Sequence, residues 1–195
     1  MQASMADFSL ERAVSAVERV RERLLRSTIA LHAAGIPYAV AGGNAVALWV
    51  SRVDPGAVRN TADVDLLVRR SDLAKVIEAL SGAGFIHKNV AGLDVFLDGP
   101  DGRARDGIHL IFEGEKVRPT EVLPNPNLSE SEAGPHFQVL GLRALVGVKL
   151  TAFRDKDRAQ LRDMIEVGLI GASFKEGFPD ILADRLQFLI DTPDG

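Results

Sequence analysis

Residues 39–68 of the chain, AVAGGNAVALWVSRVDPGAVRNTADVDLLV, hold the features that decide the predicted fold. One apolar run ends at Gly42 and Gly43, and a later apolar run carries Asp63 and Asp65. Side chains alternate between the two faces of a strand, so the aspartates share one face and the apolar residues next to them share the other. The stretch therefore predicts a strand, a glycine corner, a short helix, a loop, and a second strand that presents two carboxylates side by side.

Two carboxylates held side by side predict a metal site. Like charges a few ångströms apart destabilise each other, and a divalent cation bound by their oxygens removes the repulsion. The same repulsion predicts that replacing Asp63 or Asp65 by Asn stabilises the metal-free protein. The alternative interpretation is a solvated edge strand, because such pairs also occur in proteins that have no site there.

The glycine corner predicts a place for phosphate. Without side chains, Gly42 and Gly43 let the backbone pass close to a ligand, and the first N–H groups of the next helix, near Asn44, are left pointing toward an anion. A tight turn without a ligand is the alternative interpretation. Occurring together and in this order, the corner and the carboxylates favour a site for a metal-bound nucleotide.

This order of features resembles the nucleotidyltransferases of the DNA polymerase β superfamily, and among them the small bacterial toxins of the AbiEii and MenT type. The resemblance implies that Gly42, Gly43 and Asn44 bind the triphosphate of a nucleotide substrate. It also implies that Asp63 and Asp65 hold Mg²⁺ or Mn²⁺ and take part in catalysis. One departure is the loop over residues 51–62, which is longer than in the most compact family members.

Two further stretches extend the resemblance. Residues 59–61, Arg-Asn-Thr, are similar to the start of the Arg-x-Thr-x-Asp-x-Asp form of these toxins, which adds Thr61 to the nucleotide site. Residues 149–163, KLTAFRDKDRAQLRD, are similar to their Lys-x-x-Ala…Arg…Arg-Asp pattern. That match implies nucleotide contacts from Lys149, Arg154 and Asp157. Lys149 also lies in an apolar helix, where a lysine is costly to bury without an anion, and a triphosphate would be a sufficient anion.

The strand predicted over residues 108–112 carries His109 where the superfamily has a third carboxylate. If this strand lies beside the aspartate strand, His109 faces the two aspartates, and its pKa rises in the metal-free protein. An imidazole can serve there as a general base or as a metal ligand. The alternative is a structural, hydrogen-bonded histidine, with Asp94, Asp106 or Glu113 supplying the missing acid. Both interpretations stay open at this point.

Composition limits the class of protein. The chain has 195 residues, of which 46% are hydrophobic and 26% charged, as in ordinary soluble domains. The absence of cysteine excludes disulfides and thiolate metal sites. The longest apolar segment is too short to span a bilayer, so we expect a cytoplasmic protein without membrane contact. The net charge of −4 argues against a protein coated in nucleic acid. Arginines in the first helix are interpreted as a solvated face: Arg12, Arg19, Arg21, Arg23 and Arg26.

The predicted fold is α/β (α+β): a small mixed β-sheet nucleotidyltransferase core with flanking helices and a helical C-terminal part. We expect a core with an N-terminal helix over residues 1–140 and a helical part over residues 141–195. Apolar spacing and turn residues predict helices over residues 9–34 with Ser9 as N-cap, 44–50, 72–80, 142–153 and 178–190. Another helix, between the last two, is predicted to carry Leu161, Ile165 and Val167. Strands are predicted over residues 36–41, 63–68, 85–90, 94–97, 108–112 and 137–140. Residues 119–134 are predicted to form a surface excursion, with a lid as one interpretation.

The function implied is transfer of a nucleoside monophosphate from a metal-bound nucleoside triphosphate to an acceptor, with release of pyrophosphate. The resemblance to toxins suggests the end of a tRNA or a protein hydroxyl as acceptor, and an antitoxin as partner. Superfamily resemblance also permits a small molecule such as an antibiotic. Two alternatives from other classes are a non-catalytic module that binds a nucleotide or a partner, and a purely structural domain.

Overall fold

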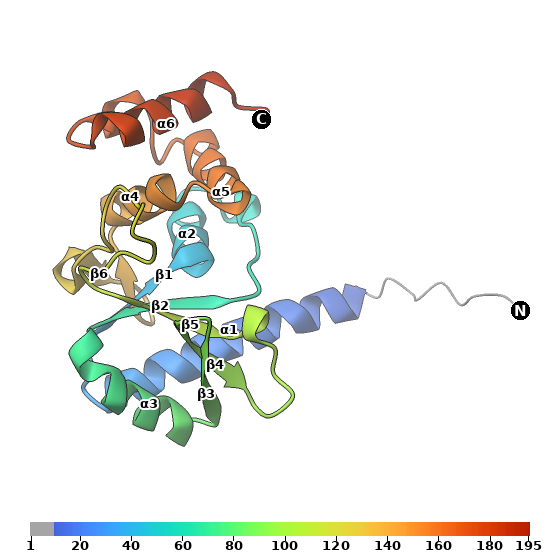
Figure 1. Cartoon of the computed structure of the whole chain (residues 1–195). Helices are drawn as coiled ribbons and strands as arrows, with labels where there is room; N and C mark the ends of the chain where they lie inside the picture. Colours follow the sequence, from blue (N-terminus) through green and yellow to red (C-terminus); the bar gives the residue numbers. More distant parts are fainter. Residues whose placement is uncertain (1–9) are drawn as a thin grey trace, which may run out of the picture.

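A computed structural model describes residues 10–195, so the predicted N-cap Ser9 lies outside the described residues. The described chain has three layers: a mixed β-sheet in the middle, with helices on both faces (Figure 1). The predicted α/β (α+β) class is confirmed. Among residues 10–195, no helix has the length and the apolar character needed to cross a membrane.

Most helices and strands occur in the predicted order along the chain. The α-helices are α1 (Leu10–Ala33), α2 (Gly42–Ser51), α3 (Leu73–Gly82), α4 (Leu142–Ala152), α5 (Asp155–Glu166) and α6 (Asp180–Asp191). The strands are β1 (Tyr38–Ala41), β2 (Val64–Val68), β3 (Phe85–Val90), β4 (Leu93–Asp98), β5 (Ile108–Phe112), β6 (Ser131–Ala133) and β7 (Gln138–Leu140). Short 3₁₀ turns lie at Pro55–Ala57, Arg70–Asp72, Ala104–Asp106, Leu128–Glu130 and Ala172–Lys175.

The seven strands form one sheet in the order β3-β4-β5-β2-β1-β7-β6. The aspartate-bearing strand β2 is central, with β1 antiparallel on one side and β5 parallel on the other. The β2–β5 register pairs Asp65 with His109, as the sequence predicts if the two strands are neighbours. The central position agrees with the apolar residues that flank both aspartates, because a central strand is covered on both faces.

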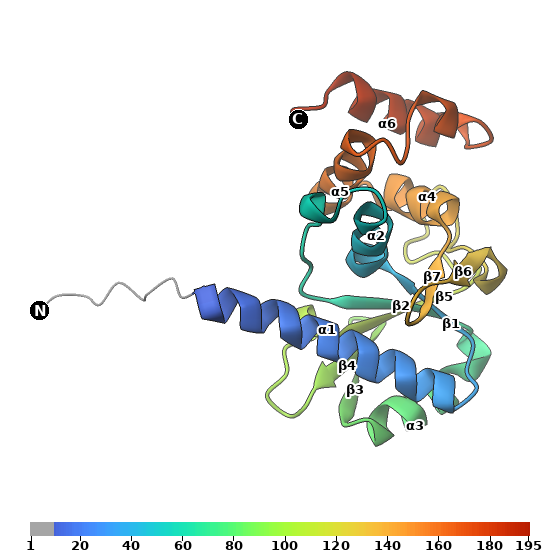
Figure 2. The same ribbon diagram turned by 180° about the vertical axis from the view of Figure 1, so that it is seen from behind.

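Alternate residues of β2 belong to two separate cores. Leu67 packs into a cluster that α2, α4, α5 and α6 cover, while Leu66 packs into a cluster that α1 and α3 cover. Figure 2, seen from behind, shows α1 crossing the second face and extending past the sheet toward the N-terminus. The two aspartates therefore open toward the layer that contains α2 and α5.

Two sequence predictions are corrected by the structure. The excursion over residues 119–134 contains a strand, β6, which pairs with β7 at the edge of the sheet. Its residues, Ser-Glu-Ala, carry no apolar alternation, so only the pairing reveals it. The first strand begins at Tyr38 rather than at residue 36, because the backbone N–H of Ile36 still bonds to Leu31 at the end of α1.

The two-core arrangement makes a prediction about stability. Leu66→Ala and Leu67→Ala should each lower the free energy of unfolding by about 2–5 kcal/mol, because each removes a fully buried side chain from a different core. Leu93→Ala, at a half-exposed position, serves as the control and should change it by less than about 1 kcal/mol. Urea unfolding measures all three. A small effect from either core variant would show that one face of the sheet is not covered.

Candidate metal and nucleotide site

The parallel pairing of β2 and β5 places an imidazole beside the two carboxylates. The Nδ1 atom of His109 lies 3.6 Å from an oxygen of Asp65 and 3.9 Å from an oxygen of Asp63. Each of the three residues offers one ligand atom, and these atoms lie within 4.8 Å of one another. Within residues 10–195 this is the one such group of three that could hold a metal ion. The predicted placement of His109 is confirmed, while its role stays a prediction.

The acidic alternatives to His109 are engaged elsewhere. Asp94 on β4 accepts hydrogen bonds from His87 and Asn89 of β3 and from Arg70 in the turn before α3. Asp106 pairs with arginines of its own turn, and Glu113 accepts a hydrogen bond from the backbone N–H of Leu128. None of these three carboxylates joins the group formed by Asp63, Asp65 and His109.

The protonation of His109 follows from its second ring nitrogen. Nε2 lies 2.7 Å from the carbonyl oxygen of Ala104, which can only accept, so Nε2 carries the hydrogen. In the neutral ring, the lone pair on Nδ1 then faces the carboxylates. A histidine bonded to a backbone carbonyl through its outer nitrogen has the usual arrangement of a metal ligand. Two carboxylates and one imidazole are a donor set that suits Mn²⁺ and also Mg²⁺.

Cations and donors of the protein compensate the charge of Asp63. The Thr61 hydroxyl donates to its carboxylate, and the Lys156 ammonium lies 3.4 Å from the other carboxylate oxygen. Burial by itself would raise the pKa of Asp63, but the Thr61 hydrogen bond and the positive charges of Lys156 and His109 together hold that pKa below its ordinary value of 3.8. The ionised carboxylate is thus favoured by the fold, which differs from the expectation based on repulsion alone.

The carboxylates also shift the titration of the histidine. The pKa of His109 is raised above 6.5 chiefly by its interaction with Asp65. Burial of the ring opposes this shift, and the Ala104 carbonyl and the negative charges of both aspartates add to it. The carboxylates thus favour a proton on Nδ1 in the metal-free protein.

The glycine corner brings α2 close to the carboxylates. Gly42 has φ +60°, a conformation that favours glycine, and a Cβ atom there would lie 1.8 Å from the carboxylate of Asp65. At Gly43, a Cβ atom would lie 2.7 Å from the side chain of Thr61. The space that the missing side chains leave is therefore used by Asp65 and Thr61. The N-terminus of α2 has no side-chain cap, so its first N–H groups remain available to an anion.

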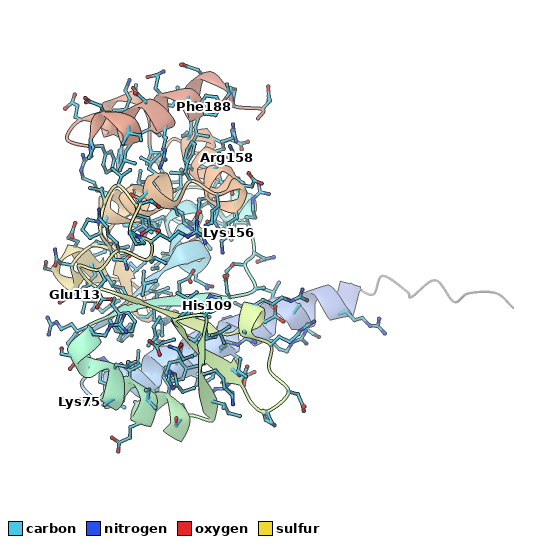
Figure 3. The ribbon with its side chains drawn as sticks, in the orientation of Figure 1. Lys75, His109, Glu113, Lys156, Arg158 and Phe188 are labelled. Atoms are coloured by element: carbon cyan, nitrogen blue, oxygen red, sulfur yellow. The ribbon has the colours of Figure 1, made fainter. Side chains whose placement is uncertain are left out.

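A cavity of about 510 Å³ opens beside this group. Gly42, Asp65 and His109 line one end of it, and Lys149, Arg154 and Asp157 line the helical wall. Residues 117–125, most of which belong to the excursion predicted over residues 119–134, form another wall. Figure 3 shows His109 at the level of the sheet and Lys156 on the helical layer above it. The structure thus brings the two separate sequence matches to one place.

The helical wall contains a buried cluster of charges. The Lys149 ammonium lies 3.0 Å from Asp157, whose carboxylate is fully buried and also accepts from the guanidinium and backbone N–H of Arg154. Burial alone would raise the pKa of Asp157, but the hydrogen bonds and charges of Arg154 and Lys149 hold it below its ordinary value. The anion that the buried lysine requires is therefore Asp157.

Two contributors to the site were not predicted. Lys156 was part of a charged run, and its reach to Asp63 depends on how α5 packs on α2, which no local pattern reports. Arg59, which the sequence comparison placed in the Arg-Asn-Thr stretch without a role, makes a two-pronged contact with Asp163 on α5 at 2.8 Å for both pairs of atoms. This ion pair ties the loop before β2 to the helical layer.

Comparisons with known proteins show the fold. No protein-family model and no curated protein sequence match the chain. The antibiotic-resistance factor ANT(2'')-Ia is similar in structure with a TM-score of 0.54 at 12% identity, over 91% of this chain and 91% of that one. An antigenic nucleotidyltransferase-like protein from Paracoccidioides brasiliensis is similar with a TM-score of 0.57 at 17% identity, over 91% of this chain and 89% of that one. The chain therefore has a nucleotidyltransferase-like fold.

The glycine corner can be tested with a matched pair of variants. Gly35→Ala introduces a side chain at φ +64° with open space around it. Its free energy of unfolding should therefore fall only by the backbone strain, about 1–2 kcal/mol. Gly42→Ala has the same backbone strain and also displaces Asp65. Its free energy of unfolding should therefore fall further, and the variant should not bind Mn²⁺. Urea unfolding and calorimetry measure both effects. Equal behaviour of the two variants would show that contact with Asp65 is unimportant.

The coupling of His109 to the carboxylates predicts a metal-dependent titration. Because the pKa of His109 is raised in the folded protein, its protonation adds stability below pH 6.5, and this contribution disappears as the pH rises through the raised value. Bound Mg²⁺ should lower the pKa again. Histidine NMR titrations with and without Mg²⁺ measure this, and the responding signal should be missing from His109→Gln. An identical titration in both conditions would place His109 outside the metal site.

Proposed function

We propose that the protein transfers a nucleoside monophosphate from a metal-bound nucleoside triphosphate to an acceptor hydroxyl, with release of pyrophosphate. The observation that carries the proposal is the group formed by Asp63, Asp65 and His109, whose ligand atoms lie within 4.8 Å of one another. This group lies against the uncapped start of α2 and opens into the cavity. The nucleotidyltransferase-like fold supports the same chemistry.

The proposed roles follow from the chemistry of each side chain. Asp63 and Asp65 hold Mg²⁺ or Mn²⁺ through carboxylate oxygens, and His109 is the third ligand through Nδ1. A bound ion would neutralise negative charge on the triphosphate and on the departing pyrophosphate. Thr61 keeps the Asp63 carboxylate in place by its hydrogen bond.

Nucleotide binding is proposed for the remaining residues around the cavity. The N–H groups at Gly42, Gly43 and Asn44 face the phosphates, since the start of α2 lacks a cap. Lys149 and Arg154 add positive charge on the opposite wall, where Asp157 orients both of them.

We propose further that the protein is of the AbiEii and MenT toxin type. Support comes from the stretch over residues 149–163, whose Lys149, Arg154 and Asp157 line the same cavity as Asp65. A toxin of this type would act on a tRNA end or a protein hydroxyl and would have an antitoxin as partner. The cavity charges favour an anionic acceptor over a cationic antibiotic, because Arg105, Arg118 and Arg185 also line it.

One observation favours a second candidate, a module that binds the nucleotide without transferring it. His109 replaces the third carboxylate, and the interaction with Asp65 raises its pKa, which favours an imidazolium beside the aspartates. A protonated ring cannot bind a metal ion through Nδ1. Binding without turnover would then be the outcome of the experiment below.

The metal-site assignment is tested by calorimetry with ATP, CTP, GTP and UTP, with and without Mg²⁺. Asp63→Asn and Asp65→Asn should each weaken metal-dependent binding at least about tenfold, while Asp101→Asn, in an exposed turn, is the control. Because the folded state lowers the pKa of Asp63, Asp63→Asn should also lose stability above pH 3.8. Wild-type affinity in both site variants would refute the assignment.

Transfer itself is tested with the nucleotide that binds, labelled in the α-phosphate. The protein is incubated separately with total tRNA, with protein and with aminoglycosides, and labelled acceptor is measured. Label in tRNA or protein would support the toxin type, label in an aminoglycoside would exclude it, and nucleotide binding without any label would support the non-catalytic module. His109→Asp should then shift the ratio of Mn²⁺ to Mg²⁺ affinity toward Mg²⁺, because an oxygen ligand replaces a nitrogen ligand.

The buried cluster makes a separate prediction for Lys149→Met. The variant should bind a triphosphate more weakly but leave monophosphate affinity nearly unchanged. It should also lose roughly 3–5 kcal/mol of stability, because it deprives the buried Asp157 carboxylate of one of its two cationic side chains. The double variant Lys149→Met/Asp157→Leu should recover part of this loss. Equal weakening for both nucleotides would place Lys149 away from the outer phosphates.

A further inference from the structure

Arg23 is a buried arginine on a helix that the toxin resemblance does not cover. The guanidinium points away from solvent, with 9% of the side chain exposed, whereas Arg19 and Arg21 on the same helix are exposed. A buried cation is costly unless it is paired and hydrogen-bonded. The burial of Arg23 is therefore explained by the groups that its guanidinium contacts.

Arg23 makes two contacts with parts of the chain that are distant in sequence. Its Nε lies 3.3 Å from a carboxylate oxygen of Asp98 at the end of β4, and its Nη1 donates to the carbonyl oxygen of Ala62 at 3.1 Å. Asp98 also accepts from Arg26, one turn further along α1. Asp98 thus supplies the negative charge, and Ala62 supplies an acceptor directly before Asp63.

The Ala62 carbonyl matters because of where it lies. Asp63 precedes the first residue of β2, and the peptide plane that follows it is held by the N–H of Val64, which donates to the carbonyl oxygen of Gly107 at 3.0 Å. The peptide that joins Ala62 to Asp63 is planar, so fixing its oxygen also fixes the plane that contains the nitrogen and Cα of Asp63. On the other side, Asn44 donates to the carbonyl oxygen of Asp63 at 2.7 Å.

We propose that Arg23 is a positioning residue for the metal ligand Asp63. Arg23 from α1 and Asn44 from α2 hold the two peptide planes on either side of Asp63, so the backbone cannot turn the carboxylate away from Asp65 and His109. Asp98 in turn orients Arg23 and neutralises its charge. This proposal rests on the proposed function, since it assumes that Asp63 binds a metal ion. It assigns to α1 a role in the site that the sequence interpretation, a solvated arginine face, did not include.

The test compares Mn²⁺ affinity with stability in matched variants. Arg23→Met removes both contacts and should weaken Mn²⁺ binding by about 10–100-fold, the range typical of residues that orient metal ligands. Arg23→Lys keeps the charge but has a single donor group, so it should recover part of that loss. Arg21→Gln, exposed on the same helix, is the control and should bind Mn²⁺ as the wild type does. Binding is measured by calorimetry or by the electron paramagnetic resonance signal of free Mn²⁺, at a temperature where all variants are folded.

Stability separates a positioning role from a merely structural one. If Arg23 only supports the fold, Arg23→Met will lower the urea midpoint while the folded protein keeps its Mn²⁺ affinity, and the proposal is overturned. If Arg23→Met does not fold, Arg23→Lys carries the same comparison.

Failure of the proposed function is recognised separately. Wild-type protein that binds no Mn²⁺, or Asp63→Asn that binds as the wild type does, would overturn the metal site and the role of Arg23 together. Wild-type binding that depends on Asp63 but not on Arg23 would overturn the positioning role alone.

Discussion

The placement of Asp63 and Asp65 side by side is the constraint on which the rest of the site depends. Both carboxylates lie at the start of a central strand, where burial makes an uncompensated charge costly. The metal-free protein offsets this cost with its own groups: the Thr61 hydroxyl, the Lys156 ammonium and the ring of His109, whose pKa the carboxylates raise. With these groups in place, the charge of the two carboxylates is compensated in the metal-free protein.

Compensation of a buried carboxylate by neighbouring cations also explains the opposite wall of the cavity. Asp157 is fully buried, and its charge is compensated by Lys149 from α4 and by Arg154 at the N-terminal end of α5. Breaking such a buried cluster costs more than the cluster contributes as a whole. The wall should thus be rigid, and its cations keep their position whether or not a nucleotide is present. A rigid wall loses less conformational entropy when an anion binds.

The two helical layers contribute to the site in different ways. The layer with α2, α4 and α5 supplies the groups that face the cavity, and the layer with α1 and α3 lies on the far side of the sheet. Arg23 is the exception, because it reaches past the edge of β2 to the Ala62 carbonyl. A helix on the far face of the sheet thus reaches the backbone directly before Asp63 on the near face.

The sequence by itself determined the features that depend on local geometry. The two-residue period of a strand places Asp63 and Asp65 together, and Gly42 marks the corner because only glycine accepts its backbone conformation beside a carboxylate. The order of most helices and strands follows from apolar spacing in the same way.

Tertiary structure alone decided which distant residues meet. The ion pair of Lys149 with Asp157, the approach of Lys156 to Asp63, and the bond from Arg23 to Ala62 all join separate elements, and β6 exists only through its pairing with β7. Such contacts depend on strand register and on helix packing, which are set by the whole core and leave no local pattern to read.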